Sequence, residues 1–133
     1  MSTPKTYVEH VAIRVSDIGW HIRFFETVLG MTLRESRGPA GAPTQCWTHG
    51  GMQLVHAPGE HPATGGALAH IGVMCENLEA TLALARQQGI PTTGAGGNWL
   101  QLPDGVIVEL IQASPASCVE QALAINPRAE EPS

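Results

Sequence analysis

Two histidines and two side chains with oxygen donors stand inside otherwise apolar, strand-like runs of this sequence. His10 and His70 each open an alternating segment, Gln53 lies within "MQLVHA", and Glu109 lies within "GVIVELI". A carboxylate in such a run costs free energy unless it is paired or coordinated. Imidazole nitrogens together with amide and carboxylate oxygens bind divalent metals at about 2.0–2.2 Å. If the fold brings the four side chains together, they predict a divalent-metal site with room for substrate.

Taken singly, each of these residues has a simpler structural explanation. A histidine in a strand is more often a hydrogen-bonded core residue than a metal ligand. Glu109 could pair with Arg14, and Gln53 could be an ordinary polar residue near a strand edge. The metal interpretation therefore depends on whether the four positions are related to one another.

An internal repeat relates them. The segment "EHVAIRVSDIGWHIRFFETVLG" (9–30) matches "AHIGVMCENLEATLALARQQG" (69–89), which places His10 on His70. Further along, "MQLVHA" (52–57) matches "VELIQA" (108–113), which places Gln53 on Glu109. Two matches in the same order indicate that one module is duplicated. Each copy supplies one histidine and one oxygen donor, which favours a shared site over four separate structural roles.

The repeat also predicts the elements that position these residues. Residues 7–15 alternate with the period of a half-buried strand. A helix should follow in each copy, capped by Asp17 or Asn77 and ended by Gly30 or Gly89. Short strand-like pieces then come at 31–36, 44–49 and 51–56 in the first copy and at 91–93, 98–102 and 106–112 in the second. The order of one strand, one helix and three strands therefore occurs twice.

Length and composition set the broad class. The chain of 133 residues, 43% of them hydrophobic, predicts one domain. We divide it into module one (7–56), a linker (57–69), module two (70–113) and a C-terminal tail (114–133). A net charge of -5 argues against nucleic acid as a partner. No apolar run reaches the roughly 18 residues of a membrane span, and no signal-peptide core is present, so no membrane partner is expected. Three cysteines without CxxC spacing favour a reducing cytoplasm.

The duplicated module and its His, Gln, His, Glu set resemble the vicinal oxygen chelate superfamily. Its members include glyoxalase I, methylmalonyl-CoA epimerase, extradiol dioxygenases, and fosfomycin and bleomycin resistance proteins. The resemblance covers about residues 7–113. It implies an α+β fold in which two tandem βαβββ modules form a cupped eight-stranded mixed sheet, usually in a homodimer. It also implies one divalent metal ion (Zn, Ni, Co, Mn or Fe) inside the cup, held by His10, Gln53, His70 and Glu109.

Two members of the superfamily share different features with the chain. "HVAIRVSD" resembles glyoxalase I, which implies that Arg14 anchors an anionic substrate, although glyoxalase I has a glutamate where Gln53 stands. The ligand order is instead that of methylmalonyl-CoA epimerases. Those enzymes use a second carboxylate on a module-one strand, whereas "TQCWTHGG" (44–51) contains none. The possible replacements are Glu35, Gln45, Cys46 and His49.

Both resemblances imply a metal-dependent lyase or isomerase, including epimerases, that acts on a small-molecule substrate through an enediolate-like intermediate. Glu109 is then the catalytic base. Two alternatives remain open. His10, His70 and Glu109 alone would form the two-His-one-carboxylate triad of Fe(II) dioxygenases. From another class, the chain could be a non-catalytic protein that binds a small molecule such as an antibiotic.

Overall fold

The computed structural model describes residues 3–59 and 67–128 of the chain. Within these residues, eight strands form one mixed sheet in the order β2-β3-β4-β1-β5-β8-β7-β6. The strands are β1 (Thr6–Val15), β2 (Leu33–Arg37), β3 (Gln45–Thr48), β4 (Met52–His56), β5 (Leu68–Cys75), β6 (Thr92–Thr93), β7 (Gly96–Gln101) and β8 (Ile107–Gln112). Residues 60–66 of the predicted linker lie outside the described residues.

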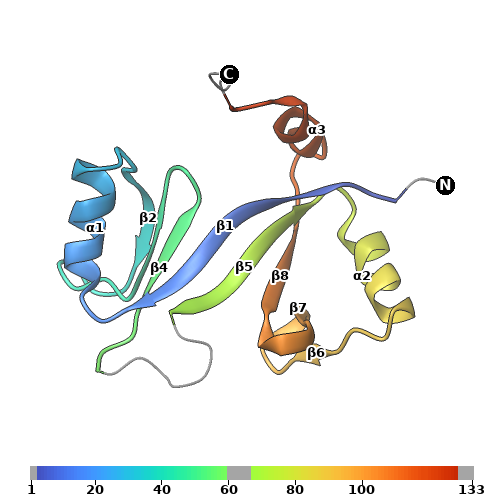
Figure 1. Cartoon of the computed structure of the whole chain (residues 1–133), viewed down its shortest axis with the longest axis horizontal. Helices are drawn as coiled ribbons and strands as arrows, with labels where there is room; N and C mark the ends of the chain where they lie inside the picture. Colours follow the sequence, from blue (N-terminus) through green and yellow to red (C-terminus); the bar gives the residue numbers. More distant parts are fainter. Residues whose placement is uncertain (1–2, 60–66, 129–133) are drawn as a thin grey trace, which may run out of the picture.

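The strand order is symmetric about the boundary between β1 and β5. These two strands pair antiparallel, while β1 pairs parallel with β4 and β5 pairs parallel with β8. The sheet is open rather than closed into a barrel, and its two halves carry equivalent elements (Figure 1). The predicted α+β class and eight-stranded mixed sheet are therefore confirmed.

The first helix of each module covers the outer face of its own half-sheet. Helix α1 (Ile18–Thr27) lies at the left end of the molecule and helix α2 (Leu78–Gln87) at the right, each against its own half of the sheet (Figure 1). The side chains of Asp17 and Asn77 accept hydrogen bonds from Trp20 N (3.0 Å) and Ala80 N (3.1 Å), as their N-cap positions predict. Because both helices occupy the outer face, the opposite face of the sheet remains for the site.

Two separate apolar clusters hold these helices in place. In the first cluster, Ile18 of α1 is buried together with Val15, Cys46 and Leu54 of the sheet. In the second cluster, which packs against α2, the buried members are Cys75, Leu100 and Leu110. Alternation along each strand then directs the intervening side chains to the inner face of the sheet. His10 and His70 are among these side chains on the inner face.

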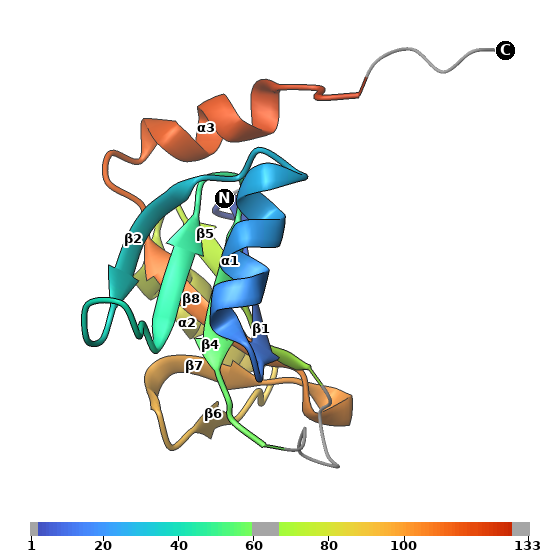
Figure 2. The same ribbon diagram turned by 90° about the vertical axis from the view of Figure 1, so that its left-hand side faces the viewer.

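The C-terminal region contains a helix that the sequence analysis did not predict. Helix α3 (Ser117–Ala124) lies across one end of the central strands in both views (Figures 1 and 2). It contacts β1 and fully buries Val119. In the second module, a 3₁₀ helix, η1 (Pro103–Gly105), connects β7 to β8. None of the helices in the described ranges is long and apolar enough to cross a membrane.

Candidate metal centre

Cross-strand pairing places the predicted ligands in two equivalent rows on the inner face. The first, here called the glutamine row, contains Trp47, Gln53, Ala12 and His70, in order across β3, β4, β1 and β5. The second, the glutamate row, contains Trp99, Glu109, Gly72 and His10 across β7, β8, β5 and β1. In each row a small residue separates a histidine from an oxygen donor. Because Ala12 and Gly72 occupy little space, the predicted ligand side chains on either side of them can approach one another.

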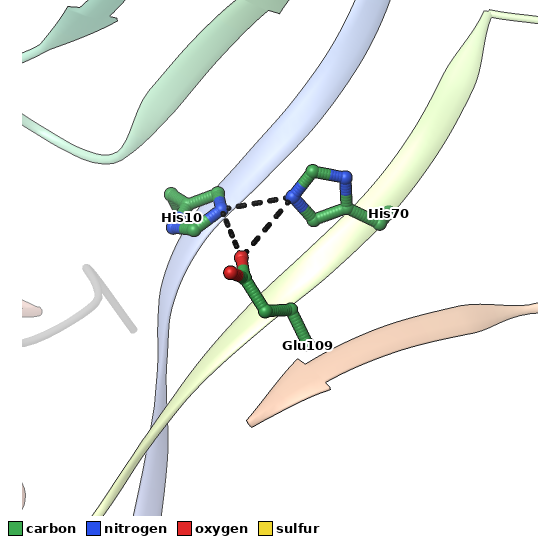
Figure 3. A group of neighbouring side chains, drawn as sticks. All are labelled: His10, His70 and Glu109. Carbon is green, nitrogen blue, oxygen red and sulfur yellow. Dashed lines mark hydrogen bonds and ion pairs between the residues drawn. The ribbon is translucent and has the colours of Figure 1, made fainter. Parts of the chain in front are cut away.

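Three of the predicted ligands meet within a single chain. His10, His70 and Glu109 come from β1, β5 and β8, and their donor atoms lie within 4.8 Å of one another (Figure 3). The two Nε2 atoms are 3.1 Å apart, and Glu109 Oε1 lies 3.6 Å from His10 Nε2 and 3.5 Å from His70 Nε2. Donors bound at about 2.1 Å to one ion are about 3.0 Å apart in octahedral and about 3.4 Å apart in tetrahedral geometry. The observed spacing therefore fits one divalent ion.

Gly72 makes this approach possible. A Cβ atom at this position would lie 2.1 Å from Cε1 and 2.4 Å from Nδ1 of His10. The imidazole thus rests directly on the backbone of β5, in space that any other residue would fill. A glycine within a strand often marks such a close contact.

A pair of β-bulges aims the two histidines. Val8 and His10 pair with the consecutive residues Val73 and Gly72, so Glu9 is an extra residue in β1. On the other strand, Ala12 and Ile13 pair with His70 and Leu68, so Ala69 is extra in β5. Each bulge residue immediately precedes one of the two histidines that are predicted ligands. Bulges reorient side chains next to functional sites, and here the two bulges are equivalent in the two modules.

Glu9 is the residue near the metal cluster that the sequence analysis missed. Its carboxylate accepts a hydrogen bond from Nδ1 of His10 and forms an ion pair with Arg34 at 3.1 Å. A proton held on Nδ1 leaves the lone pair of Nε2 directed at the cluster, which is the tautomer that a metal ligand needs. Strict alternation would place Glu9 on the face opposite His10, so only the bulge reveals the contact.

Burial and neighbouring charges shift the pKa values of Glu109, His70 and Glu9. Burial raises the pKa of Glu109, and the charge of Glu9 adds to the rise while His10 opposes it. Burial, His10 and Arg14 together lower the pKa of His70 to about 4, so this imidazole is neutral near pH 7. Burial also acts to raise the pKa of Glu9, but His10 and Arg34 outweigh it, and the net shift is downward. The cluster thus holds a neutral His70 beside a carboxylate that accepts protons more readily than an ordinary glutamate.

Gln53 and Arg14 lie beside this cluster. Gln53 is buried, lines the same cavity as His70 and Glu109, and donates from Nε2 to Gln45 Oε1 at 3.2 Å. Arg14 donates from Nη1 to the backbone oxygen of Leu68 at 2.6 Å. The assignments of Gln53 as a fourth ligand and of Arg14 as a substrate anchor stay predictions.

The inner face of the sheet encloses a cavity of about 400 Å³ around the cluster. Its lining residues are Arg37, Gln45, Trp47, Gln53, Val55, Ala69, His70, Trp99 and Glu109. Because β2 and β3 line it together with β7 and β8, the sheet must curve around it. The structure places both Trp47 and Trp99 in the cavity wall.

Replacement of Glu9 by glutamine is expected to lower metal affinity about tenfold, because partners of ligand histidines typically contribute 10- to 100-fold. Competition with a chromophoric chelator would measure the affinity for Zn²⁺. Glu35→Gln is the matched control, since Glu35 also pairs with Arg34 (3.8 Å) but is half exposed on β2. Equal affinities in Glu9→Gln and wild type would contradict a positioning role for Glu9.

Comparisons with known proteins agree with this fold. A family model described as the glyoxalase/bleomycin resistance protein/dioxygenase superfamily matches residues 9–99. A search of curated proteins finds no significant match. Similar solved structures include a methylmalonyl-CoA epimerase in complex with methylmalonyl-CoA and NH4+, with a TM-score of 0.61 and 18% identity over 84% of this chain and 96% of that chain.

Two further structures share the fold. The methylmalonyl-CoA epimerase from Mycobacterium tuberculosis has a TM-score of 0.57 and 20% identity over 84% of this chain and 90% of that one. The 2,3-dioxygenase LapB from Pseudomonas sp. KL28 has a TM-score of 0.60 and 17% identity over 80% of this chain but only 42% of its own. At such identities the likeness concerns the fold alone.

Proposed function

Because the chain belongs to the glyoxalase/bleomycin resistance protein/dioxygenase superfamily, we propose that it is a divalent-metal-dependent isomerase, epimerase or lyase. Its substrate is a small molecule with two adjacent oxygens, and the reaction passes through an enediolate-like intermediate. The observation that carries this proposal is the convergence of His10, His70 and Glu109 at 3.1–3.6 Å, with His70 and Glu109 in the wall of the cavity. A cytoplasmic location and a homodimer belong to the same proposal.

Each residue of the cluster has a distinct part in this chemistry. His10 and His70 would hold the cation together with Glu109, and Gln53 would complete the set. A divalent cation held there supplies the positive charge that stabilises an enolate oxygen. Glu109 takes the proton from the carbon beside the substrate carbonyl and returns it at the end of the reaction.

The four module-one residues considered as a second base have different surroundings. Cys46 is fully buried in the core under α1, and burial raises the pKa of its thiol. His49 contacts Thr32 at the end of β3, and Glu35 is half exposed on β2. Gln45 lines the cavity but has no group that titrates near pH 7. These positions favour chemistry in which Glu109 acts as the single base.

The alternative activity is an Fe(II) dioxygenase. The three side chains whose donor atoms converge, His10, His70 and Glu109, form a two-His-one-carboxylate set. Such a set leaves more open positions for a catechol and O₂ than a four-residue site does. Oxygen uptake with catechol, dependent on Fe(II), would favour this activity over the isomerase.

Elemental analysis of untagged protein, beside a His70→Ala variant, tests the proposal. We expect about one divalent ion per chain in the wild type and at least tenfold less in the variant, because a structural or catalytic site needs its full ligand set. His56→Ala, an exposed histidine at the end of β4, is the control and should keep the ion. Absence of metal in the wild type, even after addition of Zn, Ni, Co, Mn and Fe(II), would refute the catalytic proposal and favour a binding protein.

A further inference from the structure

The cavity carries a second set of side chains that the metal cluster does not use. Trp47 and Trp99 occupy equivalent positions, at the outer ends of the glutamine row and the glutamate row. Both line the cavity, so one indole stands on each side of the cluster. The ring of Trp99 packs edge-on against the ring of His70, with centroids 4.7 Å apart. Trp99 therefore contacts one of the predicted metal ligands directly.

A guanidinium group stands against the first of these indoles. The Cζ atom of Arg37 lies 5.1 Å from the ring centroid of Trp47, within the range of cation–π attraction. Arg37 also lines the cavity, so the stacked pair presents a positive charge to its interior. The sequence analysis gave no role to Arg37 or to its contact with Trp47.

The pairing of the strands shows that this positive charge is confined to one module. A third row of paired residues lies two residues along each strand from the glutamine row. In order across β2, β3, β4 and β1, it contains Arg37, Gln45, Val55 and Arg14. In module two, the positions equivalent to Val55 and Arg14 are Ile111 and Met74, which pair with each other. The wall formed by module one is therefore cationic at this level, whereas the wall formed by module two is apolar.

The size of the cavity limits what can fill it. At about 400 Å³ it lies toward the small end of ligand pockets, which span roughly 300–1,000 Å³. A small acid would fit inside, whereas the nucleotide part of a coenzyme A thioester would extend beyond the walls. Indoles on both sides favour a flat, unsaturated body, since aromatic faces stack with attraction beyond the buried area.

We propose that the substrate is a small aromatic or otherwise flat acid. Its body lies between Trp47 and Trp99, its carboxylate pairs with Arg37, and its two adjacent oxygens face the His10, His70 and Glu109 cluster. This inference rests on the proposed function, because it uses the metal cluster as the site of the reacting end. It assigns Arg37 and the two tryptophans as the residues that determine substrate specificity.

Three hydroxamates test this assignment, since they share one chelating head. Acetohydroxamate has no ring, benzohydroxamate adds a ring, and 4-carboxybenzohydroxamate adds a carboxylate. Calorimetry with Zn²⁺-loaded protein should show about tenfold tighter binding for each addition. In Arg37→Gln the gain from the carboxylate should disappear, while the gain from the ring should remain. Arg23→Gln, on the exposed side of α1, removes the same charge away from the cavity and should match wild type.

Variants of the tryptophans separate stacking from folding. Trp47→Leu and Trp99→Leu should each reduce the gain from the ring at least threefold, and the phenylalanine variants should restore part of it. In Trp47→Leu, whose indole does not contact the metal cluster, affinity for acetohydroxamate should stay within twofold of wild type and serves as the internal control. Loss of acetohydroxamate binding in the leucine variants but not in the phenylalanine variants would show that the tryptophans only maintain the structure of the site. That result would overturn the proposal.

Two other results would contradict the proposal at different levels. If all three hydroxamates bind the loaded wild type within twofold of one another, the assignment of a flat acid is wrong, while the metal-dependent function still stands. If metal-free protein binds them as well as Zn²⁺-loaded protein does, or if neither form binds them, the proposed function itself fails. Replacing Zn²⁺ with Co²⁺ shows directly whether the hydroxamate binds the metal, because the visible spectrum of Co²⁺ changes when the hydroxamate coordinates it.

Discussion

Alanine in place of Gly72 is expected to weaken metal binding severely, although the substitution adds only one methyl group and removes no predicted ligand. The added Cβ would lie 2.1 Å from Cε1 of His10, far inside van der Waals contact. The imidazole must then leave its place, and Nε2 moves away from His70 and Glu109. Affinity for Zn²⁺ should fall by about 100-fold or more, in line with the loss of a ligand-orienting contact.

The same substitution should also reduce stability, because overpacking of a well-packed site typically costs about 1–3 kcal/mol. Gly97→Ala is the matched control, since a Cβ at that position of β7 meets nothing within 4 Å and the backbone is not in the left-handed region. Urea denaturation of the metal-free proteins would measure the difference between the two variants.

A double variant distinguishes a local clash from general unfolding. His10→Ala removes the ring that the new methyl group would strike, so His10→Ala with Gly72→Ala should be as stable as His10→Ala alone. Contacting residues show such non-additive effects, whereas independent sites do not. Additive losses in the double variant, or normal metal affinity in Gly72→Ala, would show that His10 does not depend on this space.

The sequence was sufficient to predict the parts of the fold and site that depend on local spacing. Asp17 and Asn77 cap their helices as predicted, because capping needs only a side-chain acceptor at the right offset. His10 and His70 could be matched because the strand and helix that follow them have nearly the same length in both copies. The structure adds the parallel pairing within each module, which places Gln53 opposite Ala12 and Glu109 opposite Gly72.

Features that depend on strand register could not be predicted. Trp47 and Trp99 are equivalent in space, but the connection from β3 to β4 is a short turn, whereas β7 reaches β8 through η1. Linear alignment therefore places the two tryptophans at different distances from Gln53 and Glu109. β7 also begins at Gly96, earlier than the predicted strand at 98–102.

The contact between Glu9 and His10 was hidden for a related reason. A β-bulge changes which face a residue occupies, and the pattern of apolar residues in 7–15 carries no sign of it. The role of Gly72 was equally invisible, since a glycine in a strand does not reveal which ring lies against it. Helix α3 begins after a Pro-containing segment in a region without a counterpart in the repeat, so the duplicated pattern offered no guide.

Replacement of Glu109 by glutamine is expected to separate metal binding from catalysis. The amide oxygen can still donate to a cation, so Zn²⁺ affinity should fall only about tenfold. The amide cannot accept a proton from carbon, so exchange of substrate protons with solvent should fall by about 100- to 10,000-fold, the usual contribution of a general base. Proton NMR in D₂O, with phenylpyruvate and methylmalonyl-CoA as probes and the spontaneous rates subtracted, would measure this loss.

The pseudo-symmetry of the site supplies a control that few enzymes allow. Gln53→Glu combined with Glu109→Gln keeps one carboxylate and one amide in the proposed four-residue ligand set but moves the carboxylate to module one. Metal affinity should then return to within a few-fold of wild type, because the overall donor set is unchanged. Proton exchange should stay low, since the base now approaches the substrate from the opposite side. Wild-type exchange in Glu109→Gln alone would rule out Glu109 as the base, whereas exchange restored by the double variant would show that either wall can supply it.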